Sequence, residues 1–124
     1  MQPTDRRILY VDDEDSTRDL LEVLFTHMGL QATTAASPRE ALALVGQGGF
    51  DLYILDTRFP EGSGLELCRA LLERTPAVPV VFYSGAARAE EQEAGVCAGA
   101  AAYIPKPYID ELIKTVQRLL DKQV

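Results

Sequence analysis

The sequence alternates short apolar runs with longer amphipathic segments along almost its whole length. Five runs indicate β-strands, one of them weakly, and each is followed by a segment with apolar residues at helical spacing. The strands are expected at 7–11, 31–35, 51–55, 78–84 and 101–104, and the helices at 15–29, 37–47, 65–74, 87–100 and 108–122. Strands separated by helices run parallel, with right-handed crossovers that place helices on both faces of the sheet. The alternation therefore predicts a doubly wound α/β fold with a five-stranded parallel sheet and five helices.

The size and charge of the chain narrow the classes of function. With 124 residues, we expect one domain, residues 1–124, that buries its own core. The formal net charge of −7 argues against direct binding to nucleic acid, which requires clustered Lys and Arg. No apolar run approaches the about 18 residues needed to span a bilayer, and the N-terminal residues lack a signal-peptide pattern. We therefore expect a cytoplasmic protein without a membrane partner.

The strand expected at 51–55 ends directly in a carboxylate, Asp56. In an open parallel sheet, ligands bind beyond the carboxyl ends of the strands. The other strands bring further groups to that edge: Asp12, Asp13 and Glu14 after the first, Ser84 and Gly85 after the fourth, and Lys106 after the fifth. A lone aspartate at a strand end is usually a turn former or a helix cap. Four strands that each deliver a chemically matched group instead indicate a functional site.

The residue types at this edge suit phosphate chemistry that depends on a divalent cation. Three clustered carboxylates repel one another unless a cation neutralises them. Oxygen ligands with room for water suit Mg²⁺, which is the expected cofactor. Lys106 suits phosphate oxygens as a point charge, and Ser84 can hydrogen-bond to one. An aspartate beside such a metal can act as a nucleophile and form an acyl phosphate.

Four stretches of the sequence together form a specific signature. They are "LYVDDE" (9–14), "ILDTRFPEGSG" (54–64), "VVFYSGA" (80–86) and "AGAAAYIPKPY" (98–108). In order, spacing and strand placement they resemble the receiver domain of two-component response regulators. The resemblance covers nearly the whole chain and implies a CheY-like, flavodoxin-like fold with the strand order 2-1-3-4-5.

The resemblance also implies a role for each acid at the edge of the sheet. Asp56 would accept a phosphoryl group from the phosphohistidine of a sensor histidine kinase or of a histidine phosphotransfer protein. Asp13 and Asp56 would bind Mg²⁺ directly, and Asp12 would act largely through water. The backbone carbonyl of Arg58 would complete the metal's ligand shell.

Three further residues would act on the phosphoryl group or respond to it. Lys106 would hold a phosphoryl oxygen, and its bond to Pro107 is commonly cis in the family. Ser84 has the position of the switch hydroxyl and would move toward the phosphoryl group, while Tyr103, the switch aromatic, would rotate inward. A plainer alternative for Tyr103 is a half-buried strand aromatic. A downstream effector, or a second copy in a homodimer, would bind the altered face, which comprises the segments 87–100, 101–104 and 108–122.

Two other functions are compatible with parts of this pattern. An aspartate-nucleophile phosphohydrolase shares the strand-end acid and Mg²⁺, but it uses a second acid two residues later. This chain has Arg58 there, and a guanidinium is not a useful proton donor. A binding module that works without phosphorylation would be favoured if the acids or Lys106 were missing. We therefore expect a phosphoacceptor that catalyses its own phosphorylation and dephosphorylation, and not an enzyme with external substrates.

Several features leave alternatives open. Thr57 follows Asp56 where an aliphatic residue is commoner in the family, and Arg58 and Ala86 occupy positions that modulate dephosphorylation there. The lifetime of the phosphoryl group and the output are open, because the chain is either a free-standing regulator or part of a longer protein. Basic residues on the last expected helix and acidic residues on the one before form either a partner surface or a solvated face. The basic residues are Lys114, Arg118 and Lys122, and the acidic residues are Glu90, Glu91 and Glu93.

Overall fold

The computed structural model describes residues 6–122, so the outermost residues of the expected 1–124 domain lie outside the described part. Strands and helices alternate in this part as β1 (Arg7–Val11), α1 (Asp15–His27), β2 (Gln31–Ala35), α2 (Pro38–Val45), β3 (Leu52–Leu55), α3 (Gly64–Arg74), β6 (Val80–Ser84), α4 (Ala89–Cys97), β7 (Ala102–Pro105) and α5 (Ile109–Asp121). A two-stranded antiparallel hairpin, β4 (Arg58–Phe59) and β5 (Gly62–Ser63), lies between β3 and α3.

The main sheet contains five strands within residues 6–122, in the order β2-β1-β3-β6-β7, and all neighbouring strands are parallel. Counted along the chain without the hairpin, this is the order 2-1-3-4-5. The winding reverses at β1, because β2 lies on one side of it and β3 on the other. The predicted doubly wound α/β fold is confirmed.

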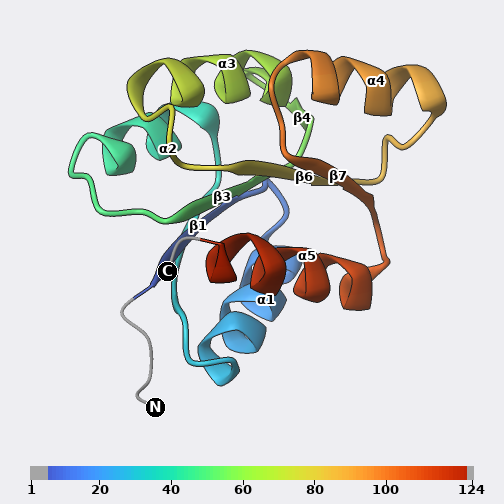
Figure 1. The fold of residues 1–124 in the computed structure, drawn as a ribbon. Coiled ribbons are helices and arrows are strands. Elements are labelled where there is room, and N and C mark those ends of the chain that lie inside the picture. Colours follow the sequence, from blue (N-terminus) through green and yellow to red (C-terminus); the bar gives the residue numbers. More distant parts are fainter. Residues whose placement is uncertain (1–5, 123–124) are drawn as a thin grey trace.

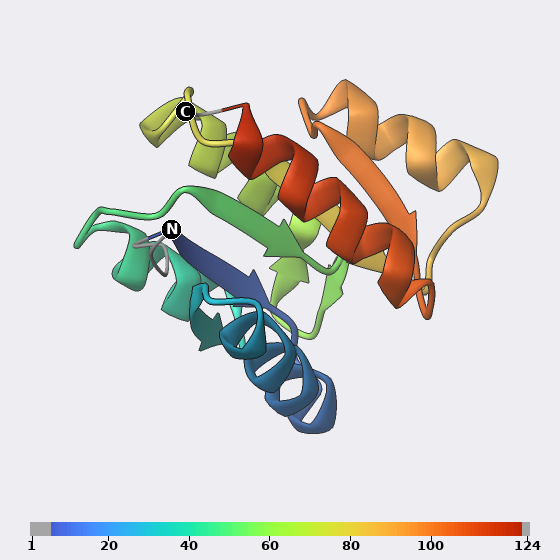
Figure 2. The same ribbon diagram turned by 60° about the horizontal axis from the view of Figure 1, so that its bottom comes forward.

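The helices form two layers that enclose the sheet. α2, α3 and α4 cover one face, and α1 and α5 cover the other, as the two views in Figures 1 and 2 show. The core is correspondingly divided in two, and alternate residues of each strand enter opposite clusters. In β1, for example, Leu9 and Val11 join the cluster under α2 and α3, whereas Ile8 and Tyr10 join the cluster under α1 and α5. Because the central strands are covered on both sides, β3 is apolar throughout and β6 is apolar up to its last residue, Ser84.

Several elements are shorter than expected, and β6 and α4 show the physical reasons. β6 begins at Val80 and not at 78, since Pro79 has no N–H to donate to the sheet ladder. α4 covers only Ala89–Cys97 of the expected 87–100. Gly99, with φ +104°, ends that helix in a left-handed conformation that suits glycine.

The segment after Asp56, expected as a loop, forms the β4–β5 hairpin and returns directly to α3. Gly64 begins α3 so close to β3 that a Cβ atom there would overlap the backbone carbonyl oxygen of Asp56. The Gly64 N–H also donates to the Thr57 carbonyl at 2.9 Å. Glycine at this position therefore lets α3 begin directly beside the carboxyl end of β3.

Among the helices of residues 6–122, none combines the length and apolar character that a membrane crossing requires.

Candidate functional site

Asp12, Asp13 and Asp56 lie together at the carboxyl edge of the sheet; we call these three residues the acidic site. Val11 and Leu55 pair in register, and the Asp56 N–H donates to the Val11 carbonyl at 3.0 Å, so the residues that follow β1 and β3 are neighbours. One carboxylate oxygen from each acid lies within 4.8 Å of the others. Asp12 is buried, Asp56 half-buried and Asp13 exposed, so solvent reaches the site at Asp13.

Asp12 is the most heavily hydrogen-bonded acid of the site. Its Oδ2 accepts from the Tyr10 hydroxyl at 2.6 Å and from Lys106 Nζ at 2.7 Å, and its Oδ1 accepts from the Glu14 N–H at 3.0 Å. Only 1% of its surface is exposed. A buried carboxylate requires such partners, because an unpaired charge in the protein interior is strongly unfavourable.

Lys106 brings a positive charge between two of the acids. Its Nζ lies 2.7 Å from Asp12 Oδ2 and 3.2 Å from Asp56 Oδ2. Burial lowers the pKa of Lys106, but its hydrogen bonds to Asp12 and Asp56 and their negative charges outweigh burial, so the pKa lies above its usual value. Lys106 is therefore a firmly protonated cation in the acidic site. The Lys106–Pro107 bond is cis, as the resemblance implied.

Two tyrosines lie beneath the acidic site. Burial raises the pKa of Tyr10 far above the usual value, and the hydrogen bond to Asp12 and the negative charge of Asp12 raise it further. Burial also raises the pKa of Tyr83, although the positive charge of Lys106 opposes this. Both phenols are therefore neutral near pH 7, and Tyr10 acts as a hydrogen-bond donor to the site.

Ser84 ends β6 and is buried, with 1% of its surface exposed. Its Oγ lies 2.8 Å from Thr57 Oγ1, and it accepts a hydrogen bond from the Ala86 N–H at 3.1 Å. Thr57 in turn donates its backbone N–H to Asp56 Oδ1 at 2.6 Å. The expected switch hydroxyl is therefore beside the acidic site, and its side-chain partner is Thr57.

Tyr103 lies on β7 and is already buried, with 9% of its surface exposed. Its ring packs against Phe82 with a centroid distance of 5.5 Å, and its hydroxyl donates to the Ala86 carbonyl. Gly95 of α4 makes room for it, because a Cβ atom there would come within 2.7 Å of the Tyr103 ring. The inward position expected after phosphorylation is thus the position in this structure.

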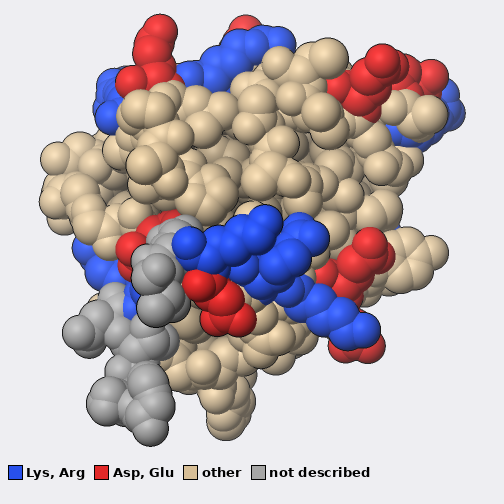
Figure 3. Space-filling view, viewed as in Figure 1, with Lys and Arg blue, Asp and Glu red and all other residues tan. Residues whose placement is uncertain are grey.

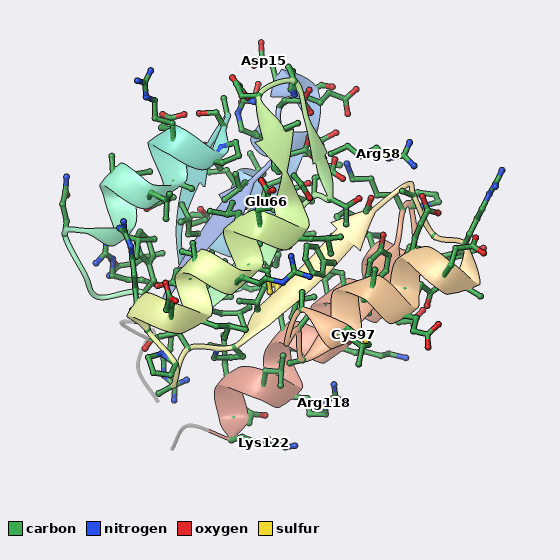
Figure 4. The ribbon with its side chains drawn as sticks, turned by 90° about the horizontal axis from the view of Figure 1, so that it is seen from above. Asp15, Arg58, Glu66, Cys97, Arg118 and Lys122 are labelled. Atoms are coloured by element: carbon green, nitrogen blue, oxygen red, sulfur yellow. The ribbon has the colours of Figure 1, made fainter. Side chains whose placement is uncertain are left out.

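The hairpin after Asp56 contacts α4 through an ion pair between Arg58 and Glu91, with 2.7 Å between Nη2 and Oε2. Arg58, labelled in Figure 4, is largely exposed. A groove of about 490 Å³ lies between the hairpin and α4, with Phe59, Leu65 and Tyr103 in its lining. The Arg58 side chain therefore extends toward α4. The position two residues after Asp56, where an aspartate-nucleophile phosphohydrolase has its second acid, thus holds a cation.

Sequence reasoning missed two residues that contact the site, Tyr10 and Thr57. The Tyr10 contact had a signal, because residues i and i+2 of a strand point to the same face, and Asp12 follows Tyr10 by two. Thr57 was noticed only as a departure from the family pattern. Its contact with Ser84, 27 positions away, depends on β3 and β6 being neighbours in the sheet.

Fold and site together define a flavodoxin-like α/β domain with the acidic site at the carboxyl edge of its sheet. The family model described as "Response regulator receiver domain" matches residues 8–117. The chain belongs to this family.

Known proteins resemble the chain in sequence and in structure. It is 34% identical over 118 residues to the response regulator protein PilR of Pseudomonas aeruginosa, covering 92% of this chain and 26% of PilR. It is 35% identical over 115 residues to the response regulator MprA of Mycolicibacterium vanbaalenii, covering 92% of this chain and 50% of MprA. The structure of TrrA from Thermotoga maritima in complex with Mg²⁺-BeF matches it with a TM-score of 0.83 at 31% identity, over 92% of this chain and 98% of that one. The chain thus spans half or less of the length of PilR and MprA.

Proposed function

We propose that this chain is a phosphate-accepting receiver of a two-component system, and that residues 1–124 form one such domain. Asp56 takes its phosphoryl group from the phosphohistidine of a histidine kinase or of a histidine phosphotransfer protein. The position of Lys106 carries this proposal, because its Nζ contacts both Asp12, at 2.7 Å, and Asp56, at 3.2 Å. An ammonium held there is within reach of an oxygen of any phosphoryl group attached to Asp56.

The residues present fit a Mg²⁺ ion. The three acids offer carboxylate oxygens within 4.8 Å of one another, and Mg²⁺ prefers oxygen ligands. Asp13 and Asp56 would hold the ion directly, together with the Arg58 carbonyl. Asp12 would act through water, because its two oxygens already accept three hydrogen bonds. When bound, the ion would neutralise charge on the acids and on the incoming phosphoryl group.

The transfer exchanges one bond to phosphorus for another. A carboxylate oxygen of Asp56 attacks the phosphorus atom, the P–O bond forms as the P–N bond to the donor histidine breaks, and the electron pair returns to the imidazole nitrogen. Lys106 then meets a phosphoryl oxygen, while Asp12 keeps its hydrogen bonds from Tyr10 and Glu14. Water later cleaves the acyl phosphate and restores Asp56. The domain is thus a phosphoacceptor that acts on itself and not an enzyme with external substrates.

The signal leaves the site through Ser84. Its hydroxyl turns to donate to a phosphoryl oxygen, and the β6–α4 loop follows, because the Ala86 N–H is bonded to Ser84 Oγ. Since Tyr103 is already buried and bonded to the Ala86 carbonyl, the change passes through the position of this loop and not through burial of the ring. A two-state element needs about 5.5 kcal/mol to go from 1:99 to 99:1. Two or three charge-assisted hydrogen bonds of about 1.5–3 kcal/mol each contribute about 3–9 kcal/mol together, a range that includes this value.

The face formed by α4, β7 and α5 would then bind a downstream effector or a second copy of the chain. Figure 3 shows a band of Lys and Arg side chains over the place that α5 occupies in Figure 1. Lys114 and Arg118 of α5 are exposed, and so is Lys122 directly after it. Glu90 and Glu93 of α4 are also exposed. These opposite charges suit contact between two copies. We place this activity in the cytoplasm, where histidine kinases act on receivers.

Phosphorylation with a small donor tests the proposal. The protein is incubated with Mg²⁺ and acetyl phosphate, and its intact mass is measured, with D56N as the matched control. We expect one phosphoryl adduct on the native protein and none on D56N or without Mg²⁺. Multiple turnovers of an external phosphate ester would support a hydrolase instead. A properly folded protein that forms no adduct would be a binding module that works without phosphorylation.

A further inference from the structure

Thr57 links the Asp56 carboxylate to the Ser84 hydroxyl. Its backbone N–H donates to Asp56 Oδ1 at 2.6 Å, and its Oγ1 lies 2.8 Å from Ser84 Oγ, with either hydroxyl able to donate. Ser84 is buried, so water does not compete for its hydroxyl. Nothing in the expected site assigned a role to Thr57, yet it contacts both the phosphoacceptor and the switch residue.

The Ser84 hydroxyl cannot meet Thr57 and a phosphoryl group from one position. When Ser84 is the donor to Thr57, its single proton is engaged there, and within residues 6–122 the partners of Ser84 Oγ are Thr57 Oγ1 and the Ala86 N–H. The Oγ positions of a serine are separated by its staggered rotamers. When Ser84 Oγ turns toward a phosphoryl oxygen on Asp56, it therefore leaves the position at which it meets Thr57.

We infer that Thr57 is a positioning residue that holds the Ser84 hydroxyl in the unphosphorylated state and competes with the phosphoryl group for it. The inference rests on the proposed function, because it presupposes a phosphoryl group or its analogue at Asp56. The Thr57 hydroxyl thereby sets how readily the domain switches, although it does not touch the reacting atoms. The net contribution of one hydrogen bond corresponds to a factor of about 2 to 12 in an equilibrium constant.

Substitution of the Thr57 side chain isolates this hydrogen bond. The contact with Asp56 uses the backbone N–H, so it is present whatever the side chain. Valine has the β-branched shape of threonine without the hydroxyl, and serine has the hydroxyl without the methyl group. T57V therefore removes the restraint on Ser84, and T57S retains it.

Titration with beryllofluoride in saturating Mg²⁺ measures the competition without any phosphoryl donor. The wild-type protein, T57V and T57S are compared by calorimetry, and the amide shifts of Ala86 and Asp56 are followed by NMR. We expect T57V to bind beryllofluoride about 2- to 12-fold more tightly than the wild type, and T57S to lie within about twofold of it. In an S84A background, T57V should change the affinity by less than about twofold, because the competing hydroxyl is absent. Urea unfolding of every variant checks that each one is folded. If valine prevents folding, T57A replaces T57V.

The possible results separate this inference from the proposed function. If the folded wild type binds no beryllofluoride, the proposed function fails and the inference fails with it. If the wild type binds but T57V binds equally, Thr57 does not restrain Ser84. If T57V binds more weakly, Thr57 supports Ser84 in the liganded state and the competition is wrong. Tighter binding by T57V that persists in the S84A background would also overturn the inference, because the effect would not pass through Ser84.

Discussion

The Tyr10 hydroxyl donates a hydrogen bond to Asp12 Oδ2 at 2.6 Å, so β1 both carries the first acid of the site and anchors it. Lys106 Nζ contacts the same oxygen at 2.7 Å. If Lys106 turns toward a phosphoryl oxygen, Asp12 Oδ2 still accepts the hydrogen bond from Tyr10. Tyr10 therefore keeps the Asp12 carboxylate in place while the lysine moves.

Y10F should destabilise the protein more than the loss of an ordinary tyrosine hydroxyl does. Hydrogen bonds to charged groups contribute about 1.5–3 kcal/mol, so we expect the free energy of unfolding in urea to fall by about that amount. Y53F is the matched control, since the hydroxyl of the buried Tyr53 lies 3.0 Å from the neutral Thr75 hydroxyl. Its expected loss is about 0.5–1.5 kcal/mol. Equal losses for the two variants would contradict the conclusion that Tyr10 anchors the Asp12 carboxylate.

Alkaline pH should weaken the fold through Tyr10. Its pKa is raised in the folded state above the usual value of 10.0, so above that pH the unfolded chain releases a proton that the folded protein retains. The stability that this group contributes is therefore complete below pH 10 and decreases as the pH rises further. Each such group adds a slope of about 1.4 kcal/mol per pH unit. Urea unfolding between pH 9 and 11 should show a shallower decrease for Y10F than for the wild type, and parallel curves would refute this assignment.

D13N should weaken Mg²⁺ binding by roughly tenfold or more, because it removes a direct carboxylate ligand. D15N is the control, since it removes an equal charge from the exposed partner of Arg18, outside the acidic site. The D15N affinity should stay within about threefold of the wild type, because an exposed charge is screened. Calorimetric titration with Mg²⁺ measures both. If the two variants weaken binding equally, the ion is attracted by net charge alone and has no defined site at Asp13.

G95A should disturb the seat of Tyr103. A Cβ atom at this position would lie 2.7 Å from the Tyr103 ring and 3.1 Å from the Phe82 ring. Overpacking typically costs about 1–3 kcal/mol, which exceeds the about 1 kcal/mol that alanine gains over glycine in a helix, so we expect a net loss of stability. Near-ultraviolet circular dichroism should also change as the aromatic pair shifts. G62A, where a Cβ atom meets nothing within 4 Å, should stay within about 0.5 kcal/mol of the wild type.

The fold and the acidic site were predictable because both follow from local patterns. The alternation of apolar runs and amphipathic segments requires parallel strands, and parallel strands deliver their last residues to one edge. Asp12, Asp13, Asp56, Ser84 and Lys106 each follow or end a strand, so their convergence needed no knowledge of side-chain conformation. The exact ends of elements were less predictable, as Pro79 and Gly99 show, because they depend on single backbone hydrogen bonds and angles.

By itself, the sequence determined the doubly wound sheet, its acidic edge and the residues gathered there, since periodicity and strand ends are properties of consecutive residues. Only the tertiary structure decided the partners of those residues: Thr57 for Ser84, Glu91 for Arg58, and the buried seat of Tyr103 against Phe82. Such pairs join positions far apart in the chain, and which atoms meet depends on strand neighbours, helix placement and rotamers that a one-dimensional pattern does not encode.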